Sequence, residues 1–332
     1  MTWLSDATIE RLREAGDWPD LSGTRYDALG VLGRGGMSTV YRARDRELDR
    51  EVALKVMGPV EGDGIVARLR NEARVLARLE HPGLVPVHDI GTLPDGRLFY
   101  VMRLVRGQRL DDHARQERSL PALLRLFERV CEAVAFAHAQ GVLHRDLKPA
   151  NVMVGPFGEV LVLDWGLAKL VEGAAPAAAA GPLARVDEAG VTPTVALADA
   201  PTRTRRGTVL GTPGYMAPEQ ARGEVDRLDQ RADVYALGAM LRFLLEAREE
   251  TAPRALQAIA RKATAPAPEE RYQGVAALAT DVARFLSAEP VEAHPERVAE
   301  RLVRLLSKHR VPVALVAAYL VMRVLLAVFA GI

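Results

Sequence analysis

The sequence predicts an α+β protein with two lobes, followed by a membrane-spanning helix. Strand-like stretches separated by Gly, Asp and Pro turns fill residues 26–105, with one helical segment among them. Apolar residues then recur at helical spacing through most of 106–290, and the chain closes with an apolar segment at 311–332. We therefore expect a small antiparallel sheet lobe with one helix, a larger mainly α-helical lobe, and a C-terminal transmembrane helix.

Strand-like stretches define the first lobe. One helix is expected among them at Ile65–Leu79, and the lobe follows an N-terminal extension (1–25) with a short helix around Ser5–Glu14. The four stretches that read as strands are YDALGVLG, STVYRARD, REVALKVM and RLFYVMRLV.

The second lobe is predicted from four helical patterns and two short strands, NVMV and EVLVLD. Between 164 and 219 an Ala/Pro/Gly/Thr-rich stretch has no steady period and is typical of a long loop. A basic amphipathic linker follows the lobe at 291–310. The helices are expected near 120–139, 229–246, 254–264 and 274–287.

Composition excludes several classes of partner. The chain has 332 residues with 44 basic and 43 acidic side chains and a formal charge of +1, so no global field favours nucleic acid. Aromatic residues make up only 5%, which argues against base stacking. The single cysteine, Cys131, excludes an intrachain disulfide and lies in an amphipathic helical pattern, where we expect it in the core.

The segment Val311–Ile332 is predicted to span a membrane once. It carries one charge, Arg323, and is long enough for a hydrocarbon core of about 30 Å. Lys308 and Arg310 precede it and no charge follows, so the positive-inside rule places the rest of the chain in the cytoplasm, at the inner (plasma) membrane. A buried terminal helix and a membrane-surface helix are the alternatives.

The strongest chemical signal is the stretch VLHRDLKPANVMV. Phosphoryl transfer from ATP to a hydroxyl needs a carboxylate near the hydroxyl, a cation on the transferred group, and metal ligands. Asp146 suits the first requirement and Lys148 the second, while Asn151 offers a carbonyl oxygen to Mg²⁺. Asp164, which ends the strand-like stretch VLVLD, offers a carboxylate as second metal ligand.

A candidate nucleotide loop lies upstream in LGRGGMSTVY. It meets the pattern G-x-G-x-x-G-x-V at Gly33, Gly35 and Val40, but Ser38 takes the third glycine position. By itself the stretch is equally a glycine-rich turn between two strands. Lys55 in VALK follows on the next strand, and Glu72 lies on the helix, placed to orient Lys55 by an ion pair. Each alone reads as an ordinary surface charge.

Taken together and in this order, these stretches resemble the protein-kinase signature set, over roughly Tyr26–Glu289. The phrases YDALGVLGRGGMSTVYRARD, HPGLVPVHDIG, DWGLAK and GTPGYMAPEQ are similar to the bacterial eukaryotic-like (Hanks-type) Ser/Thr protein kinases. A kinase domain, a basic linker and one C-terminal span also match the membrane-anchored members. The resemblance implies the bilobal protein-kinase fold, with a kinase domain at 26–290.

The resemblance also implies a role for individual residues. Leu76, Val87, His144 and Trp165 would stack as a hydrophobic spine, Arg103–Val105 would form the hinge that reads the purine through its main chain, and Met102 would be the gatekeeper. The catalytic residues would be Asp146, Lys148 and Thr212; the ATP-binding residues Leu32, Gly33, Gly35, Gly36, Ser38, Val40, Ala53, Lys55, Glu72, Met102 and Met153; the Mg²⁺ ligands Asn151 and Asp164; and the structural or regulatory residues Arg145, Glu219, Asp233 and Arg271. Glu219 would pair with Arg271, and Asp233 would accept hydrogen bonds from the catalytic-loop backbone.

The segment 164–219 would be an activation loop, longer than is typical of the family. An arginine beside the catalytic aspartate, here Arg145, is usually neutralised there by a phosphate on that loop. Thr202, Thr204 and Thr208 are the candidate autophosphorylation sites.

These inferences predict a Ser/Thr protein kinase that uses ATP and Mg²⁺ (Mn²⁺ as an alternative), acts on Ser/Thr hydroxyls of proteins, and is tethered to the membrane. A homodimer in which one copy phosphorylates the other is a further expectation. The alternative is a nucleotide-binding pseudokinase that serves as a membrane scaffold. A small-molecule phosphotransferase is disfavoured, because GTPGYMAPE serves protein substrates in the family. The chain is short after residue 246, where relatives carry a loop and helix that dock substrates.

Overall fold

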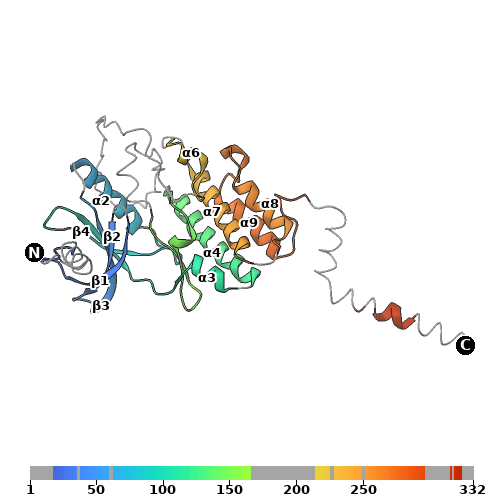
Figure 1. Ribbon diagram of the computed structural model, residues 1–332, viewed down its shortest axis with the longest axis horizontal. Coiled ribbons are helices and arrows are strands. Elements are labelled where there is room, and N and C mark those ends of the chain that lie inside the picture. The colour runs from blue at the N-terminus through green and yellow to red at the C-terminus, as the bar shows by residue number, and fades with distance from the viewer. Residues whose placement is uncertain are drawn as a thin grey trace, which may run out of the picture.

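The computed structural model describes most of the two predicted lobes (Figure 1). The described residues are 18–35, 38–59, 63–117, 119–165, 214–224, 228–248, 251–295, 315 and 318–323. Within the first helix the side chains of residues 63–66, 68–69 and 72 are not described.

The N-terminal lobe is a five-stranded antiparallel sheet with one helix. Its strand order is β1-β2-β3-β5-β4, and every neighbouring pair is antiparallel. The elements are β1 (Tyr26–Arg34), β2 (Ser38–Asp45), β3 (Arg50–Met57), α2 (Asp63–Ala77), β4 (Val87–Thr92) and β5 (Leu98–Arg103).

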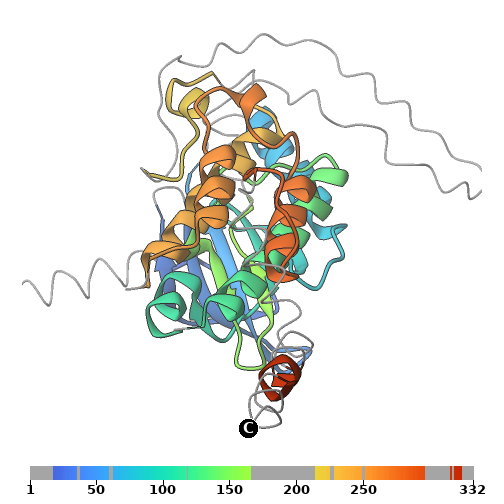
Figure 2. The same ribbon diagram turned by 90° about the vertical axis from the view of Figure 1, so that its right-hand side faces the viewer.

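The second lobe is mainly helical and carries a small three-stranded sheet of order β6-β7-β8. Viewed from the helical side, α7, α8 and α9 lie in front of the N-terminal sheet (Figure 2). The elements are β6 (Gln108–Arg109), α3 (Leu110–Gln116), α4 (Leu120–Ala139), the 3₁₀ turn η1 (Pro149–Asn151), β7 (Val152–Val154), β8 (Val160–Val162), α6 (Pro218–Ala221), α7 (Gln230–Glu246), α8 (Arg254–Ala263), the 3₁₀ turn η3 (Pro268–Glu270) and α9 (Val275–Leu286).

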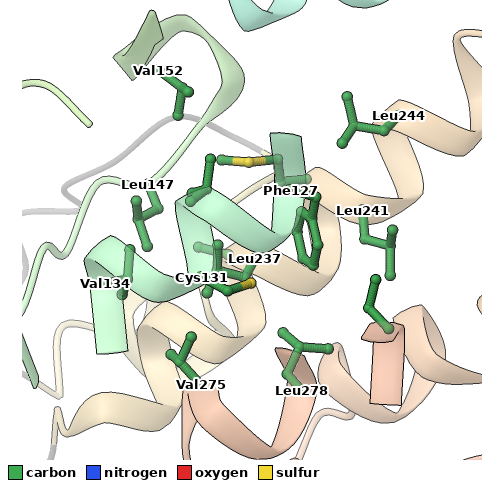
Figure 3. Close-up of a cluster of buried hydrophobic side chains, with 14 of the residues drawn as sticks. Phe127, Cys131, Val134, Leu147, Val152, Leu237, Leu241, Leu244, Val275 and Leu278 are labelled. Carbon is green, nitrogen blue, oxygen red and sulfur yellow. The ribbon is translucent and has the colours of Figure 1, made fainter. Parts of the chain in front are cut away.

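The core of the helical lobe forms where α4, α7 and α9 meet (Figure 3). Phe127 and Cys131 on α4 face Leu237 and Leu241 on α7, and Leu278 on α9 closes the cluster; all five are fully buried. Burial of apolar surface on this scale is the main favourable term in folding. Cys131 therefore lies in the core, as expected. Burial raises the pKa of its thiol well above the ordinary value.

Local sequence explains where the long helices begin and how closely they pack. The Ser119 side chain accepts a hydrogen bond from the Ala122 amide at the start of α4, and Asp229 accepts one from the Arg231 amide at the start of α7. At Gly238 an added Cβ would lie 2.5 Å from the Cβ of Ala263, so only glycine permits this approach of α7 to α8.

Both faces of the N-terminal sheet carry buried apolar side chains. One face carries an apolar cluster that includes Tyr41, Leu54 and Val101. The opposite face packs in part against α2 through Met57, Ala73, Leu98 and Tyr100. This second face is the one that turns toward the helical lobe and carries the predicted ATP-binding side chains.

The antiparallel sheet lobe and the helical lobe agree with the predicted fold class, with some local differences. The helix expected at Ile65–Leu79 is α2, Asp63–Ala77; it ends early because the amides of Arg78 and Leu79 bond to carbonyls three residues back. Asn151 belongs to η1 and not to the expected strand, since Pro149 begins a tight turn there. The strands β4 and β6 and the helices α3 and α6 were not predicted.

Some predictions fall on residues outside the description. These are the N-terminal helix, residues 296–310 of the linker, the segment 166–213 with its threonines, and most of the predicted span 311–332. The described start of the linker, residues 291–295, is a turn and not the predicted helix, because the amides of Glu292 and Ala293 donate to the Asp281 carboxylate. Among the residues that the structure describes, no helix is long and apolar enough to cross a membrane.

Candidate active site

Two rows of side chains across the sheet build the N-terminal wall of the site. Residues directly opposite in an antiparallel pair point to the same face. Lys55 on β3 lies opposite Val40 on β2 and Tyr100 on β5, which makes the first row. Ala53 lies opposite Met102 and makes the second. The strand register thus places four predicted ATP-binding residues, and Tyr100 with them, on one surface.

Lys55 joins this wall to the second lobe. Its Nζ lies 2.7 Å from Oδ1 of Asp164, which follows β8, and the Lys55 side chain is only 8% exposed. Burial alone would lower the pKa of Lys55, but Tyr100 and Asp164 outweigh it and raise the pKa. Burial would likewise raise the pKa of Asp164, and the Lys55 ammonium holds it below the ordinary value. Both groups are therefore charged at neutral pH.

Asp164 has an unusual backbone, with φ of 56°, in the left-handed region that few residues other than glycine adopt. Strain of this kind costs about 1–3 kcal/mol and clusters at functional sites. The Asp164 side chain is 45% exposed although it is paired with Lys55. A carboxylate held at the lobe boundary, charged and accessible, suits a metal ligand.

Apolar side chains from both lobes fill the space beside Asp164. Leu76 on α2, Val87 on β4 and Trp165 line one cavity of about 30 Å³, with Tyr100 and Asp164 also in its wall. The His144 ring lies 4.7 Å from the Trp165 ring, centroid to centroid. The four residues predicted to stack as a spine thus lie in one contiguous region, with Trp165 at its centre.

His144 is fixed as a neutral imidazole. It is fully buried, and burial lowers its pKa. Its Nε2 lies 2.8 Å from the Leu163 carbonyl and its Nδ1 accepts from the Asp146 amide at 3.3 Å, which together define one tautomer. The ring therefore ties the catalytic loop to the segment that carries Asp164.

The catalytic loop places its polar groups around Asp146. Lys148 Nζ lies 3.2 Å from Asp146 Oδ2. The side-chain amide nitrogen of Asn151, Nδ2, donates to the backbone carbonyl of Asp146 at 2.9 Å and lies 3.4 Å from Asp146 Oδ2. An amide whose nitrogen is engaged in this way presents its oxygen elsewhere, so Asn151 can offer a carbonyl oxygen to a cation.

Asn151 and Asp164 fit a magnesium site that is completed by the nucleotide. Mg²⁺ is commonly held by one or two protein oxygen ligands together with substrate phosphates. Among the residues described, no group of three or more His, Cys, Asp and Glu side chains could hold a metal by itself. The oxygens of Asn151 and Asp164 are the donor type that Mg²⁺ prefers, and their small number leaves room for phosphate oxygens.

Asp233 on α7 holds the backbone of the catalytic loop. Its two carboxylate oxygens accept from the amides of His144 and Arg145, each at 2.8 Å. His138 on α4 also contacts it, with Nε2 2.7 Å from Oδ2. Burial would raise the pKa of Asp233, yet these hydrogen bonds, led by that of His138, lower it. A buried carboxylate with this many donors stays charged and rigid.

Arg145 is clamped from a second side. Its carbonyl accepts a hydrogen bond from the Gln220 side chain on α6 at 2.7 Å, and its φ is 65°. The loop backbone is therefore held in a left-handed conformation between α7 and α6. This contact links the segment expected to dock protein substrates with the residue beside Asp146.

Glu219 and Arg271 form a buried bidentate pair. Arg271 Nη1 and Nη2 lie 2.7 Å and 2.8 Å from the two Glu219 oxygens, and the Arg271 side chain is 0% exposed. The remaining guanidinium donors reach the carbonyls of Ala265, Arg231 and Pro266. Burial would raise the pKa of Glu219, but Arg271 lowers it. Every N–H group of this guanidinium has an acceptor.

The glycine loop differs from the expectation in one respect. The Gly35 amide donates to the Ser38 carbonyl at 2.8 Å, so it is engaged within the loop and not directed at a ligand. Gly36 lies outside the described residues. Gly33 lies opposite Val40 in the β1–β2 ladder, as a strand position.

The predicted adenine pocket is partly assembled. Ala53 is buried and Leu32 is 47% exposed at the end of β1. Met153 on β7 pairs with Arg109, on the small sheet of the second lobe. Arg103 ends β5, and its amide donates to the Pro86 carbonyl. These residues therefore come from both lobes.

Several predicted residues lie outside the description. The side chain of Glu72 is not described, so its expected ion pair with Lys55 stays a prediction; the partner that is described is Asp164. Thr212 and the three candidate phosphorylation sites, Thr202, Thr204 and Thr208, are also outside it.

The sequence analysis missed three residues that shape the site. Tyr100 shares a face with Met102 because they are two apart on β5, and strand alternation alone would have revealed this. His138 and Gln220 bind Asp233 and the Arg145 carbonyl across long sequence separations. No local sequence pattern predicts such contacts.

Comparison with known families identifies the family of the chain. A family model for the protein kinase domain matches residues 26–266. The chain therefore belongs to the protein kinase family, as the motif order predicted.

Its relatives are bacterial serine/threonine-protein kinases. The chain is similar to serine/threonine-protein kinase pkn3 of Myxococcus xanthus, at 38% identity over 229 residues that cover 67% of this chain and 37% of that protein. It is also similar to PknB of Mycobacterium leprae, at 34% identity over 308 residues that cover 83% of this chain and 45% of that protein. The chain thus spans less than half the length of these relatives. They support a bacterial Hanks-type Ser/Thr kinase domain.

The buried guanidinium of Arg271 yields a stability prediction. Arg271→Lys is expected to lower the free energy of unfolding by about 2–4 kcal/mol, because an ammonium has too few donors for the acceptors that Arg271 satisfies. Arg284→Lys is the matched control, since Arg284 is 42% exposed and only flanks Asp281 at 3.5 Å; it should change stability by less than about 0.5 kcal/mol. Denaturant unfolding of both variants measures this, and equal losses would contradict the assignment.

Proposed function

We propose that the chain is an active Mg²⁺- and ATP-dependent protein Ser/Thr kinase that transfers the γ-phosphoryl group to protein hydroxyls. The observation that carries this proposal is the catalytic loop, where Lys148 and Asn151 both contact the Asp146 carboxylate. The names of the relatives, all serine/threonine-protein kinases, support the choice of Ser/Thr hydroxyls. The chain covers only part of each relative, so the activity of the relatives is carried over to it as a proposal.

Asp146 would position the acceptor hydroxyl. Its carboxylate would accept the hydroxyl hydrogen bond as the hydroxyl oxygen attacks the γ-phosphorus, the bond to the ADP oxygen breaks, and the hydroxyl proton passes to Asp146 or on to solvent. Lys148, 3.2 Å from Asp146, would counter the negative charge of the transferred group. Because Asp233 and Gln220 fix the backbone beside Asp146, this geometry is set before substrate binds.

Lys55 would bind the α- and β-phosphates, and the adenine would lie between Ala53 and Met153. Asn151 and Asp164 would hold Mg²⁺, which would supply positive charge to neutralise the phosphates. Lys55 and Asp164 are already adjacent. Lys55 would exchange Asp164 for phosphate oxygens, and Asp164 would exchange Lys55 for Mg²⁺. Because each group keeps a partner of opposite charge, the exchange would cost little desolvation.

The alternative is a pseudokinase that binds nucleotide and acts as a membrane scaffold. It would use the same N-terminal wall without turnover. The intact set of Asp146, Lys148, Asn151 and Asp164 favours the active enzyme, since a scaffold would not need all four. Turnover decides between them.

Autophosphorylation of the full chain tests the proposal. With Mg²⁺ and labelled ATP the wild type should label itself, and Lys55→Met and Asp146→Asn should each lower the rate at least a hundredfold, because they remove a phosphate contact and the hydroxyl-positioning group. Asp112→Asn is the matched control, since Asp112 is exposed and its ion pair among the described residues is with Arg115. Label that persists in both site variants, or an unlabelled wild type, would refute the active enzyme.

The activation segment would be regulated by phosphorylation. We place the sites at Thr202, Thr204 and Thr208, whose phosphates would neutralise Arg145 beside Asp146. Mapping of the phosphates in the labelled wild type identifies them, and a rate that rises with protein concentration would support trans-phosphorylation between two copies.

The membrane tether at 311–332 is a separate proposal, supported by its apolar composition and the basic residues before it. It would hold the kinase domain on the cytoplasmic face of the inner (plasma) membrane. The full chain should stay in the membrane pellet after alkaline carbonate washing, and a chain ending at residue 310 should be released. Extraction of the full chain by carbonate would exclude a span.

A further inference from the structure

Tyr100 lies in the first cross-strand row, directly opposite Lys55. It is 4% exposed, and its ring centroid lies 5.8 Å from Lys55 Nζ. The same side chain lines the cavity that Asp164 lines. Tyr100 therefore adjoins both members of the ion pair that connects the lobes.

The surroundings of Tyr100 are otherwise apolar. It belongs to one buried cluster with Met57, Ala73 and Leu98, and the cavity wall continues with Leu76 and Val87. A phenol group is costly to bury without a polar partner, and a buried tyrosine usually finds one. Among the residues described, Asp164 is the charged group in the wall of this cavity, and the Lys55 ammonium lies over the Tyr100 ring.

We propose that Tyr100 is a positioning residue for Lys55, which keeps the ammonium directed at the nucleotide phosphates when Asp164 engages the metal. The inference rests on the proposed function and goes beyond it, since none of the catalytic motifs contains Tyr100. It assigns a second partner to Lys55 on the strand next to its own.

Lys55 would lose its ion-pair partner when Asp164 engages the metal. With Asp164 as the ammonium's partner at 2.7 Å, loss of that contact would leave a flexible side chain in a largely apolar wall. The ring face and the phenol oxygen of Tyr100 both attract a cation. Since the strand register fixes Tyr100, this attraction does not depend on the metal.

A neutral partner has an advantage over an acidic one at this place. The phenol of a tyrosine is uncharged at neutral pH, because its ordinary pKa is about 10. It orients the ammonium without placing a negative charge beside the phosphates. Lys55 therefore retains its full charge for the nucleotide.

A role in packing alone would predict something different. Tyr100→Phe keeps the ring and its apolar contacts and removes only the hydroxyl, so a packing residue would tolerate it. A positioning residue would lose affinity for the phosphates and not for the nucleoside. Tyr41→Phe is the matched control: it also removes a buried hydroxyl of the same sheet, but Tyr41 lies opposite Leu54 on the other face.

Calorimetric titration of the full chain with ADP and with adenosine, both with Mg²⁺, tests the inference. Tyr100→Phe should bind ADP about three- to tenfold more weakly than the wild type and adenosine within twofold of it. The KM for ATP should rise by a similar factor, with a smaller change in kcat. Tyr41→Phe should match the wild type with both ligands.

Three outcomes would overturn the positioning role: unchanged ADP affinity in Tyr100→Phe, an equal loss for adenosine, or an equal loss in Tyr41→Phe. A wild type that binds ADP and autophosphorylates while Tyr100→Phe behaves identically refutes this inference alone. A wild type that binds no ADP refutes the proposed function instead.

Discussion

The contact between Lys55 and Asp164 is the interaction on which the site depends. It joins β3 of the sheet lobe to the end of β8 in the helical lobe at 2.7 Å. Both groups are charged because each shifts the pKa of the other against the effect of burial. The pair sets the spacing between the lobes at the point where the nucleotide phosphates are proposed to lie. It also keeps a positive charge on Lys55 for the phosphates and a negative charge on Asp164 for the metal.

The second lobe contributes rigidity. Asp233 binds the catalytic-loop amides from α7, Gln220 holds the Arg145 carbonyl from α6, and His144 ties the loop to the Leu163 carbonyl. The pair Glu219–Arg271 anchors α6 itself in a fully satisfied buried cluster. The strain at Arg145 and Asp164 is thus supported by contacts from several elements, as expected where backbone geometry serves a site.

Sequence alone predicted the elements whose periodicity is strong. The helix at 120–139 agrees with α4, and the other long helices of the second lobe agree within a few residues. The charged contacts were harder, because they depend on register and on distant segments. The expected pair of Glu72 with Lys55 stays a prediction, whereas the described contact of Lys55 with Asp164, on the other lobe, was not predicted. Tyr100 escaped notice because a tyrosine in a strand usually indicates only core packing.

The most direct measurement of the central claim is the effect of Mg²⁺ on ADP affinity in the wild type and in Asp164→Asn. If Lys55 and Asp164 divide the phosphates and the metal between them, Mg²⁺ should tighten ADP binding to the wild type about tenfold or more. Asp164→Asn should lose most of that gain and bind metal-free ADP at least as well as the wild type. A variant that keeps the full gain from Mg²⁺ would contradict the account.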